Sequence, residues 1–292
     1  MKGLFASFKD MFGNKKGFAV YGTQGGISTS LTLPEGFDPE KDRCPMVLLM
    51  HGFMSSKRLY PMPQLAKALA KEGIASVRFD FNAHGKSEGK FIDMTIANEI
   101  SDAKAVLDYV RTLPFVTETA FVGHSQGGVV AGMLAGELEE DPGKPVCLVQ
   151  LAPAAVLKDD AIAGQCMGVK YNPADPPEYV SVMFHKLGRT FIKAAQKLPI
   201  YETSGKYTGK VLLIHGKNDS IVPYSYCERY HQTYKDSEMI LIEDEGHMMR
   251  KNKEQIIASV TEFIKSNTIR QISSDEKTYH LSDASAPVGK WR

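Results

Sequence analysis

The chain has 292 residues, of which 43% are hydrophobic and 24% are charged. This balance is ordinary for a globular protein, so composition excludes a disordered, collagen-like or coiled-coil chain. Thirty-five Lys and Arg residues oppose 34 Asp and Glu residues, which gives a formal net charge of +1. Because no long block of one sign occurs, we expect a small-molecule partner and no nucleic acid.

The cysteine pattern and the apolar runs predict neither a metal centre nor a membrane span. No Cys-x-x-Cys pair and no zinc-like Cys/His spacing occurs among Cys44, Cys147, Cys166 and Cys227. We therefore expect buried free thiols, no metal and no cofactor. No apolar run reaches the roughly 18 residues that cross a bilayer, and the N-terminus lacks the pattern of a signal peptide. The sequence predicts a soluble, cytoplasmic protein.

The two ends of the chain differ from the region between them. Residues 1–17 form an amphipathic segment whose apolar positions recur at helical spacing, at Leu4, Phe5, Phe8, Met11 and Phe12. A helix docked on the domain is the favoured interpretation, and weak contact of residues 4–12 with a membrane surface is the alternative. Residues 267–292 are polar and predict a loosely ordered tail. The sequence leaves the oligomeric state open, and a homo-oligomer is compatible with it.

Between these ends, strand patterns alternate with helical patterns. Residues 18–24 and 27–33, separated by two glycines, predict an antiparallel hairpin. The later strands are apolar on successive positions, as in a parallel sheet buried on both faces, and cover residues 46–50, 74–79, 120–122, 146–151, 211–214 and 239–242. The helical patterns cover residues 65–71, 96–113, 127–138, 224–234 and 253–264. The order predicts a doubly wound, mostly parallel α/β core made of residues 18–152 and 205–266.

Residues 153–204 interrupt this alternation. A connection of that length needs structure of its own. Apolar side chains recur there at about helical period, at Phe184, Leu187, Phe191, Ala194 and Leu198. The segment leaves the sheet at the carboxyl end of a parallel strand, which is the edge where open α/β sheets bind ligands. We therefore expect a helical lid insertion over a ligand site, with a purely structural excursion as the alternative.

The sequence GHSQGG at residues 123–128 carries the chemistry. It directly follows a predicted strand and directly opens a predicted helix. In such a turn the serine occupies a strained conformation that exposes its Oγ, and the flanking glycines let neighbouring backbone approach. A bare G-x-S-x-G arises by chance, but this placement between strand and helix is specific. Ser125 is the predicted nucleophile.

A serine hydroxyl needs a base to accept its proton and a carboxylate to orient that base. In this fold both should follow the serine, in the order acid and then histidine, each after a strand. Asp219 follows the strand pattern at 211–214, and His247 follows the one at 239–242. The acidic run at 243–245 is too close to His247 to form a separate loop, and we interpret it as a solvated charge cluster.

The remaining histidines have simpler interpretations. Those beside glycines in loops commonly bind backbone and are His51, His84, His124 and His215. The others lie in helical or tail contexts and are His185, His231 and His280. The order Ser125, Asp219, His247 therefore predicts a catalytic triad.

An oxyanion hole should use the N–H after the nucleophile and one from the loop after the strand at 46–50. These two donors are the backbone N–H groups of Gln126 and Phe53. The helix that Ser125 opens also directs free N–H groups and its dipole toward the same place. The ring of Phe53 is either a wall of the acyl pocket or an ordinary core aromatic.

Seven motifs together resemble one family: HGF at 51–53, FDFNAHGKSEG at 79–89, GHSQGG at 123–128, LAPAA at 151–155, LPIYE at 198–202, LLIHGKND at 212–219 and EGH at 245–247. In this order they resemble the α/β-hydrolase superfamily, and within it the bacterial feruloyl (cinnamoyl) esterases. The resemblance covers about residues 18–265. It implies an α/β-hydrolase fold and hydrolysis of hydroxycinnamate esters by Ser125, His247 and Asp219, with the insertion over the acyl group.

The resemblance also implies polar groups near the phenol of the substrate, an acid and a tyrosine. Asp160 stands where the acid is expected, but Phe191 stands where the tyrosine is expected.

Other functions are compatible with the same triad. A monoacylglycerol lipase or a general short-chain carboxylesterase would share the triad and differ in the insertion. A haloperoxidase or a C–C hydrolase could reuse it as well, because fold does not fix reaction. A non-catalytic binding module is the alternative from another class, although all three triad residues are present.

Overall fold

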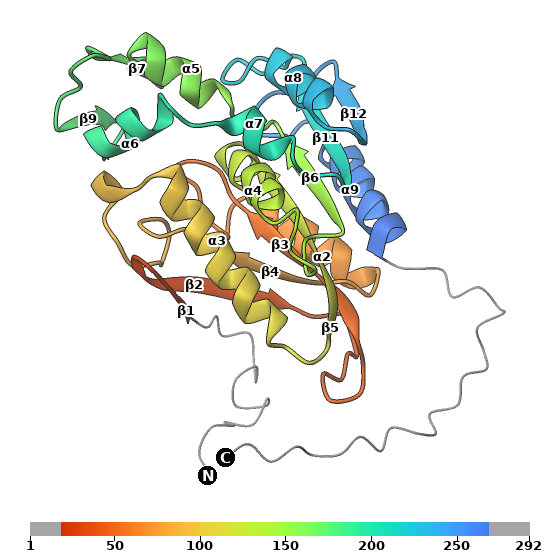
Figure 1. The fold of residues 1–292 in the computed structure, drawn as a ribbon. Coiled ribbons are helices and arrows are strands. Elements are labelled where there is room, and N and C mark those ends of the chain that lie inside the picture. Colours follow the sequence, from red (N-terminus) through yellow and green to blue (C-terminus); the bar gives the residue numbers. More distant parts are fainter. Residues whose placement is uncertain (1–18, 269–292) are drawn as a thin grey trace, which may run out of the picture.

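A computed structural model of the chain describes residues 19–268. An eight-stranded sheet with helices on both faces forms its centre (Figure 1). The predicted amphipathic segment 1–17 lies outside the described residues. So does the predicted tail, except for its first two residues, which end the last helix, α9 (Lys253–Thr268).

The main sheet is mostly parallel. Its strands are β1 (Ala19–Gly22), β2 (Gly25–Thr32), β3 (Cys44–Met50), β4 (Ala75–Phe79), β5 (Val116–His124), β6 (Cys147–Leu151), β11 (Lys210–Gly216) and β12 (Ser237–Ile242). They lie in the order β1-β2-β4-β3-β5-β6-β11-β12. Strand β2 is antiparallel to both neighbours, and every other pairing is parallel. The predicted hairpin and the predicted doubly wound α/β sheet are confirmed.

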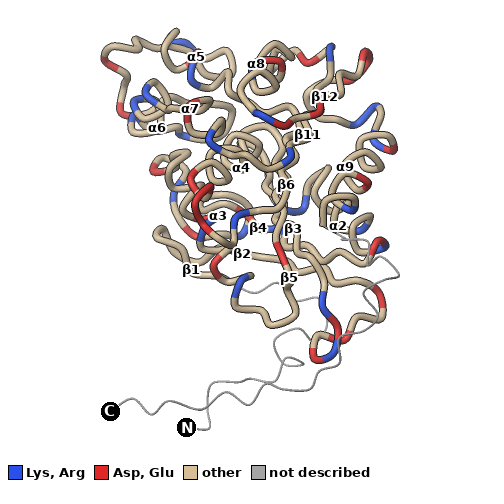
Figure 2. The backbone as a smooth tube through the Cα atoms, turned by 45° about the vertical axis from the view of Figure 1, so that its right-hand side comes forward, with Lys and Arg blue, Asp and Glu red and all other residues tan. Residues whose placement is uncertain are grey.

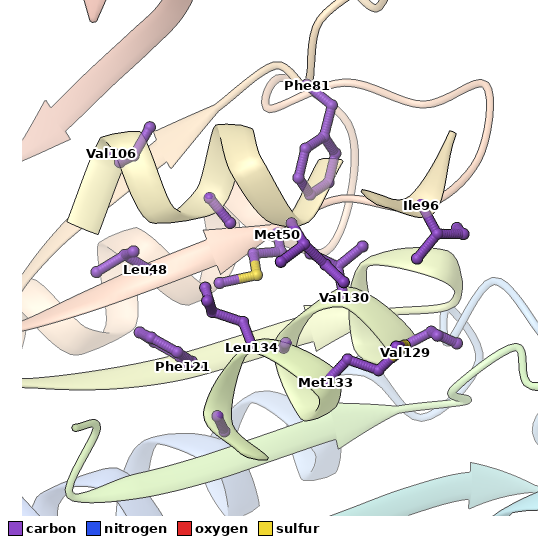
Figure 3. Close-up of a cluster of buried hydrophobic side chains, with 14 of the residues drawn as sticks. Leu48, Met50, Phe81, Ile96, Val106, Phe121, Val129, Val130, Met133 and Leu134 are labelled. Atoms are coloured by element: carbon purple, nitrogen blue, oxygen red, sulfur yellow. The ribbon is translucent and has the colours of Figure 1, made fainter. Parts of the chain in front are cut away.

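Helices cover the sheet on both faces because its strands are apolar on both. One face carries α3 (Ile96–Arg111), α4 (Gln126–Glu137) and α8 (Ser225–Thr233), and the other carries α2 (Met62–Lys71) and α9. Successive residues of β3 point in opposite directions: Leu48 packs with α3 and α4, whereas Leu49 packs with α2 and α9. Figure 3 shows Leu48 and Phe121 of the sheet facing Leu134 of α4. Full burial of such a side chain contributes about 1.5–3 kcal/mol, so this packing fixes the helices on the sheet.

Residues 153–204 contain both helices and strands, so the prediction of a helical insertion is wrong in part. In chain order its elements are α5 (Val156–Ala163), β7 (Gln165–Cys166), β8 (Val169–Lys170), β9 (Tyr179–Val182), β10 (His185–Gly188), α6 (Arg189–Ala195) and α7 (Ile200–Ser204). β7 pairs with β8 and β9 with β10, each pair antiparallel. In Figure 1 α5, β7, β9 and α6 lie beyond the carboxyl edge of the sheet, while α7 packs on α4.

The predicted helical stripe in this segment is broken at its start. Phe184 lies in the turn between β9 and β10 and is 95% exposed, and Leu187 belongs to β10. The alternating burial of Val180 and Val182 along β9 is a period of two. A strand competes with a helix for such a short apolar run, and here the strand pairing prevails. Phe191 and Ala194 do lie in a helix, the short α6.

Lys and Arg positions are interspersed with Asp and Glu positions along the described part of the chain (Figure 2). Insertion and core alike carry Lys and Arg close to Asp and Glu. Within residues 19–268, no helix combines the length and the apolar character that a membrane span needs.

Candidate active site

Ser125 lies in the sharp turn between β5 and α4, at the carboxyl edge of the sheet. Its backbone has φ +57° and ψ −123°, a region that residues other than glycine rarely adopt. The turn holds because the Ser125 N–H donates to the carbonyl of Leu151 at 2.8 Å, and its own carbonyl accepts from Gly128 at 2.9 Å. A Cβ at Gly127 would overlap the carbonyl oxygens of Met50 and His51, so this turn requires glycine there.

The structure brings the three residues of the predicted triad together. Ser125 Oγ lies 2.8 Å from Nε2 of His247, and Nδ1 of His247 lies 2.8 Å from Oδ2 of Asp219. Asp219 follows β11 and His247 follows β12, so both loops reach the same sheet edge as Ser125. A carboxylate can only accept, so Nδ1 of His247 carries the proton and Nε2 is free to accept the serine proton.

Asp219 is held as an anion by several donors at once. Burial alone would raise the pKa of this carboxyl, but hydrogen bonds from His215 and His247 and from the backbone of Val222 lower the pKa below its usual value. Nε2 of His215 lies 3.1 Å from Oδ2 of Asp219 and 2.9 Å from the carbonyl of Val222. Because both partners are acceptors there, this nitrogen carries the proton. His215 thus stabilises the Asp219 carboxylate, a role that the sequence did not predict.

The acidic run after β12 is not a uniformly solvated cluster, so that interpretation is wrong for one of its members. Glu245 is only 2% exposed. Its carboxylate accepts backbone N–H groups from Gly246, Lys251 and Asn252, at 3.0, 3.3 and 2.5 Å. These hydrogen bonds lower the pKa of Glu245 against the opposing effect of burial. Glu245 therefore shapes the loop that carries His247.

The two predicted oxyanion donors lie beside Ser125. A Cβ added at Gly52 would lie 2.9 Å from Cβ and 3.4 Å from Oγ of Ser125, so the backbone that leads to Phe53 passes directly over the serine. Gln126 is the first residue of α4. Among the hydrogen bonds of residues 19–268, none uses the backbone N–H of Phe53 or of Gln126. Two N–H groups without partners among the described residues, next to the predicted nucleophile, suit a developing oxyanion.

A buried ion pair anchors the loop that carries Phe53. Nζ of Lys57 lies 2.5 Å from Oδ2 of Asp80, and the backbone N–H of Lys57 donates to Oδ1 of Asp80 at 2.7 Å. Both side chains are buried, and the pair joins the loop after β3 to the end of β4. His51 adds a second link, because Nε2 of its ring accepts the Phe81 N–H at 3.1 Å while Nδ1 donates to the Gly52 carbonyl at 2.8 Å. The loop is therefore rigidly placed.

A cleft of about 570 Å³ opens at Ser125 between the sheet edge and the insertion. That size suits a small organic ligand. Its walls include Phe53 and Phe191, whose ring centroids are 6.3 Å apart, together with Ala154, Leu157 and Val222. Both residues predicted to bind substrate, Asp160 and Phe191, line this cleft.

Part of the cleft wall is polar, and the sequence reading missed most of it. Gln165 donates from Nε2 to Oδ1 of Asp160 at 2.7 Å, and the Tyr171 hydroxyl donates to the carbonyl of Gln165 at 3.2 Å. All three side chains line the cleft. Mainly because of burial, the pKa of Tyr171 is raised to about 12, so its hydroxyl keeps its proton. A tyrosine hydroxyl thus lies near Asp160 after all, from a position at which no sequence pattern distinguishes it.

Within residues 19–268, no group of three or more His, Cys, Asp or Glu side chains is placed to hold a metal ion. The cysteines in this range are unpaired. Among them, Cys166 lines the cleft. Mainly because of burial, the pKa of the Cys166 thiol is raised to about 11.

Comparisons with known proteins agree with this geometry. A family model described as "Serine aminopeptidase, S33" matches residues 41–171, and one described as "TAP-like protein" matches residues 190–275. The structure of Est1E from Butyrivibrio proteoclasticus with ferulic acid bound is 28% identical, with a TM-score of 0.81 over 86% of this chain and 98% of Est1E. The chain has the α/β-hydrolase fold. The predicted fold and the predicted resemblance to serine esterases of this superfamily are confirmed.

The chain also resembles a mouse protein named "Palmitoyl-protein thioesterase ABHD10, mitochondrial". The two are 26% identical over 190 residues, which is 63% of this chain and 62% of the mouse protein. The chain therefore spans less than two thirds of that relative's length. A structure of mouse α/β hydrolase domain-containing protein 10 matches with a TM-score of 0.66 at 19% identity, over 86% of this chain and 99% of that one. At that identity the likeness shows the fold alone.

Proposed function

We propose that the protein is a serine carboxylesterase in which Ser125 is the nucleophile, His247 the base and Asp219 the orienting acid. The observation that carries the proposal is a continuous chain of two contacts. Ser125 Oγ contacts the His247 ring and the His247 ring contacts Asp219, each at 2.8 Å. This arrangement activates a hydroxyl that is otherwise inert near neutral pH. Its position at the opening of a cleft gives a substrate access to it.

The proposed reaction proceeds in two steps. Ser125 Oγ attacks the ester carbonyl carbon while its proton passes to Nε2 of His247, and the carbonyl oxygen becomes an oxyanion held by the N–H groups of Phe53 and Gln126. The C–O bond to the alcohol then breaks, and His247 returns the proton to the leaving oxygen. Water repeats the sequence on the acyl-Ser125 ester, releasing the carboxylic acid and restoring the serine.

For the acyl group, we propose a hydroxycinnamate such as ferulate. Two observations support it: the apolar walls at Phe53 and Phe191 suit an aromatic ring, and the polar wall at Asp160 and Tyr171 suits a phenol hydroxyl. The similarity to Est1E, a protein with a ferulic acid complex, points the same way. We propose that the insertion acts as a lid that sets acyl preference, because α5 and α6 supply residues of both walls.

A second candidate is hydrolysis of long-chain acyl esters or thioesters. Met167 and Ile221 line the cleft, yet they are 48% and 42% exposed. Large apolar side chains left in solvent at a cleft would suit an alkyl chain that extends out of it. The name of the mouse relative, a palmitoyl-protein thioesterase, gives this candidate its substrate class.

One comparison of substrates separates the two candidates. We expect a higher kcat/KM for methyl ferulate than for methyl cinnamate, because a site built to bind a hydroxyl rejects the analogue that lacks it. Asp160→Ala and Tyr171→Phe should reduce this preference. Asp159→Ala and Tyr179→Phe are the matched controls, since neither residue lines the cleft. High activity on p-nitrophenyl palmitate or an S-palmitoyl thioester, with methyl ferulate uncleaved, would favour the second candidate.

A further inference from the structure

Behind Ser125, a buried carboxyl group contacts the residue that supplies one oxyanion donor. Nε2 of Gln126 donates to Oε2 of Glu99 at 2.8 Å. Glu99 is 1% exposed and lies in the first turn of α3, and Gln126 is 3% exposed and begins α4. Sδ of Met94 packs 3.9 Å from the same amide nitrogen. The contact ties the N-terminal turn of α4 to the neighbouring helix.

The surroundings of Glu99 favour its neutral form. Burial raises its pKa well above the ordinary value, against the Gln126 hydrogen bond, and the charge of Asp102 one turn further along α3 raises it further. Asp102 is itself fully buried, and its Oδ2 accepts the Asn82 N–H at 2.7 Å. A small cavity borders Glu99 and Asp102, and its other charged lining residues, Lys90 and Asp93, are exposed to solvent.

We propose that Glu99 is a positioning residue of the oxyanion hole, which holds the Gln126 side chain so that the backbone N–H of Gln126 points at the cleft. The inference rests on the proposed function. Gln126 has no other side-chain partner of comparable strength among the described residues, so this contact fixes its rotamer and the start of α4. An ionised carboxylate at Glu99 would oppose the forming oxyanion in a site of low dielectric, so the neutral form is the one that serves catalysis.

A positioning role predicts that substitution of Glu99 changes kcat and KM to different extents. The oxyanion exists only in the transition state, so a misplaced Gln126 N–H lowers kcat and leaves KM nearly unchanged. A purely structural role would instead lower stability and leave kcat unchanged for the fraction of protein that is folded. The conservative variant Glu99→Gln keeps an acceptor for Gln126 and is permanently neutral, so it should restore the rate that Glu99→Ala loses.

The test compares the full-length wild type with Glu99→Ala, Glu99→Gln and Val106→Ala. Val106 is the matched control, since it is fully buried on the same helix two turns further along. The readouts are kcat and KM on p-nitrophenyl acetate, the labelling rate of Ser125 by a fluorophosphonate, and the melting temperature. We expect Glu99→Ala to lower kcat and labelling about tenfold, the effect of a lost hydrogen bond, with KM within about twofold. Glu99→Gln should recover to within about threefold, and Val106→Ala should lose stability alone.

The inference is overturned if Glu99→Ala keeps its kcat, or if Glu99→Gln is as slow as Glu99→Ala. Should Glu99→Ala fail to fold, Glu99→Gln decides alone, because a neutral acceptor must support turnover. This test does not depend on the ferulate proposal, because neither p-nitrophenyl acetate nor the fluorophosphonate carries a feruloyl group. A wild type that resists labelling at Ser125 would overturn the serine-esterase proposal and this inference together, before any variant is compared.

Discussion

Nε2 of His124 donates a hydrogen bond of 2.8 Å to the backbone carbonyl of His247. The two rings also pack with centroids 5.3 Å apart. Burial lowers the pKa of His124 to about 4, so this side chain is neutral near pH 7 and has one proton to donate. The residue that precedes the proposed nucleophile therefore holds the loop that carries the proposed base.

We predict that His124→Ala slows turnover without removing the triad. Loss of one hydrogen bond of about 0.5–1.5 kcal/mol lets the His247 loop move, which corresponds to a decrease in kcat of about tenfold or less. Steady-state kinetics on p-nitrophenyl acetate measure this, and His231→Ala, at an exposed position on α8, is the control. Equal kcat values for the two variants would show that the His124 contact does not position the base.

A second prediction concerns the carboxylate that His215 and His247 share. Asp219→Asn should lower kcat by roughly 10³–10⁴, because an amide can hold His247 in the wrong tautomer. His215→Ala leaves the carboxylate in place and removes only one of its donors, so a decrease of about tenfold is expected. The two variants are compared in kcat, with melting temperatures to confirm folding. If Asp244→Asn proved more damaging than Asp219→Asn, the assignment of the acid would be wrong.

A third prediction concerns stability and pH. Burial raises the pKa of Asp102 to about 7, from an unfolded-state value of about 3.9. Between about pH 4 and pH 7 the folded protein thus holds a proton that the unfolded chain has released, so the free energy of unfolding falls as pH rises across that window. The full contribution is up to about 4 kcal/mol. The raised pKa of Glu99 acts in the same direction.

Asp102→Asn removes one of these two protons and should flatten the dependence. Urea unfolding of the wild type and the variant measures it at about pH 5, inside this window, and at about pH 8, above the pKa of Asp102. The wild type should lose more stability than the variant between the two conditions. An identical loss in both proteins would contradict a raised pKa at Asp102.

The sequence predicted the parts of the site that depend on local order. Ser125 was identifiable because its turn needs glycines between a strand and a helix, and Asp219 and His247 because each follows a strand of a parallel sheet. Parallel strands bring their carboxyl ends to one edge, so the order along the chain determines which loops meet. The same argument found Phe53 and Gln126, which adjoin the strand end and the nucleophile.

The parts that depend on long-range packing were not predictable. Tyr171 lines the cleft directly after the β7–β8 hairpin of the insertion, and the pairing of that hairpin depends on contacts that no period in the sequence reveals. The burial of Glu99 and Glu245 likewise follows from tertiary contacts, since charged residues of this type are usually exposed. The prediction of a helix beginning near Phe184 was wrong because a short apolar run fits a strand as well as a helix.

Turnover of Ser125→Ala tests most directly whether Ser125 attacks the substrate. The variant removes only an oxygen at a site whose backbone is fixed by the turn, so its melting temperature should stay close to that of the wild type. Its kcat on methyl ferulate or p-nitrophenyl acetate should fall by about 10⁴-fold or more, because the oxyanion hole and binding alone supply only the residual rate. A Ser125→Ala variant that folds normally and turns over at a near wild-type rate would contradict the account.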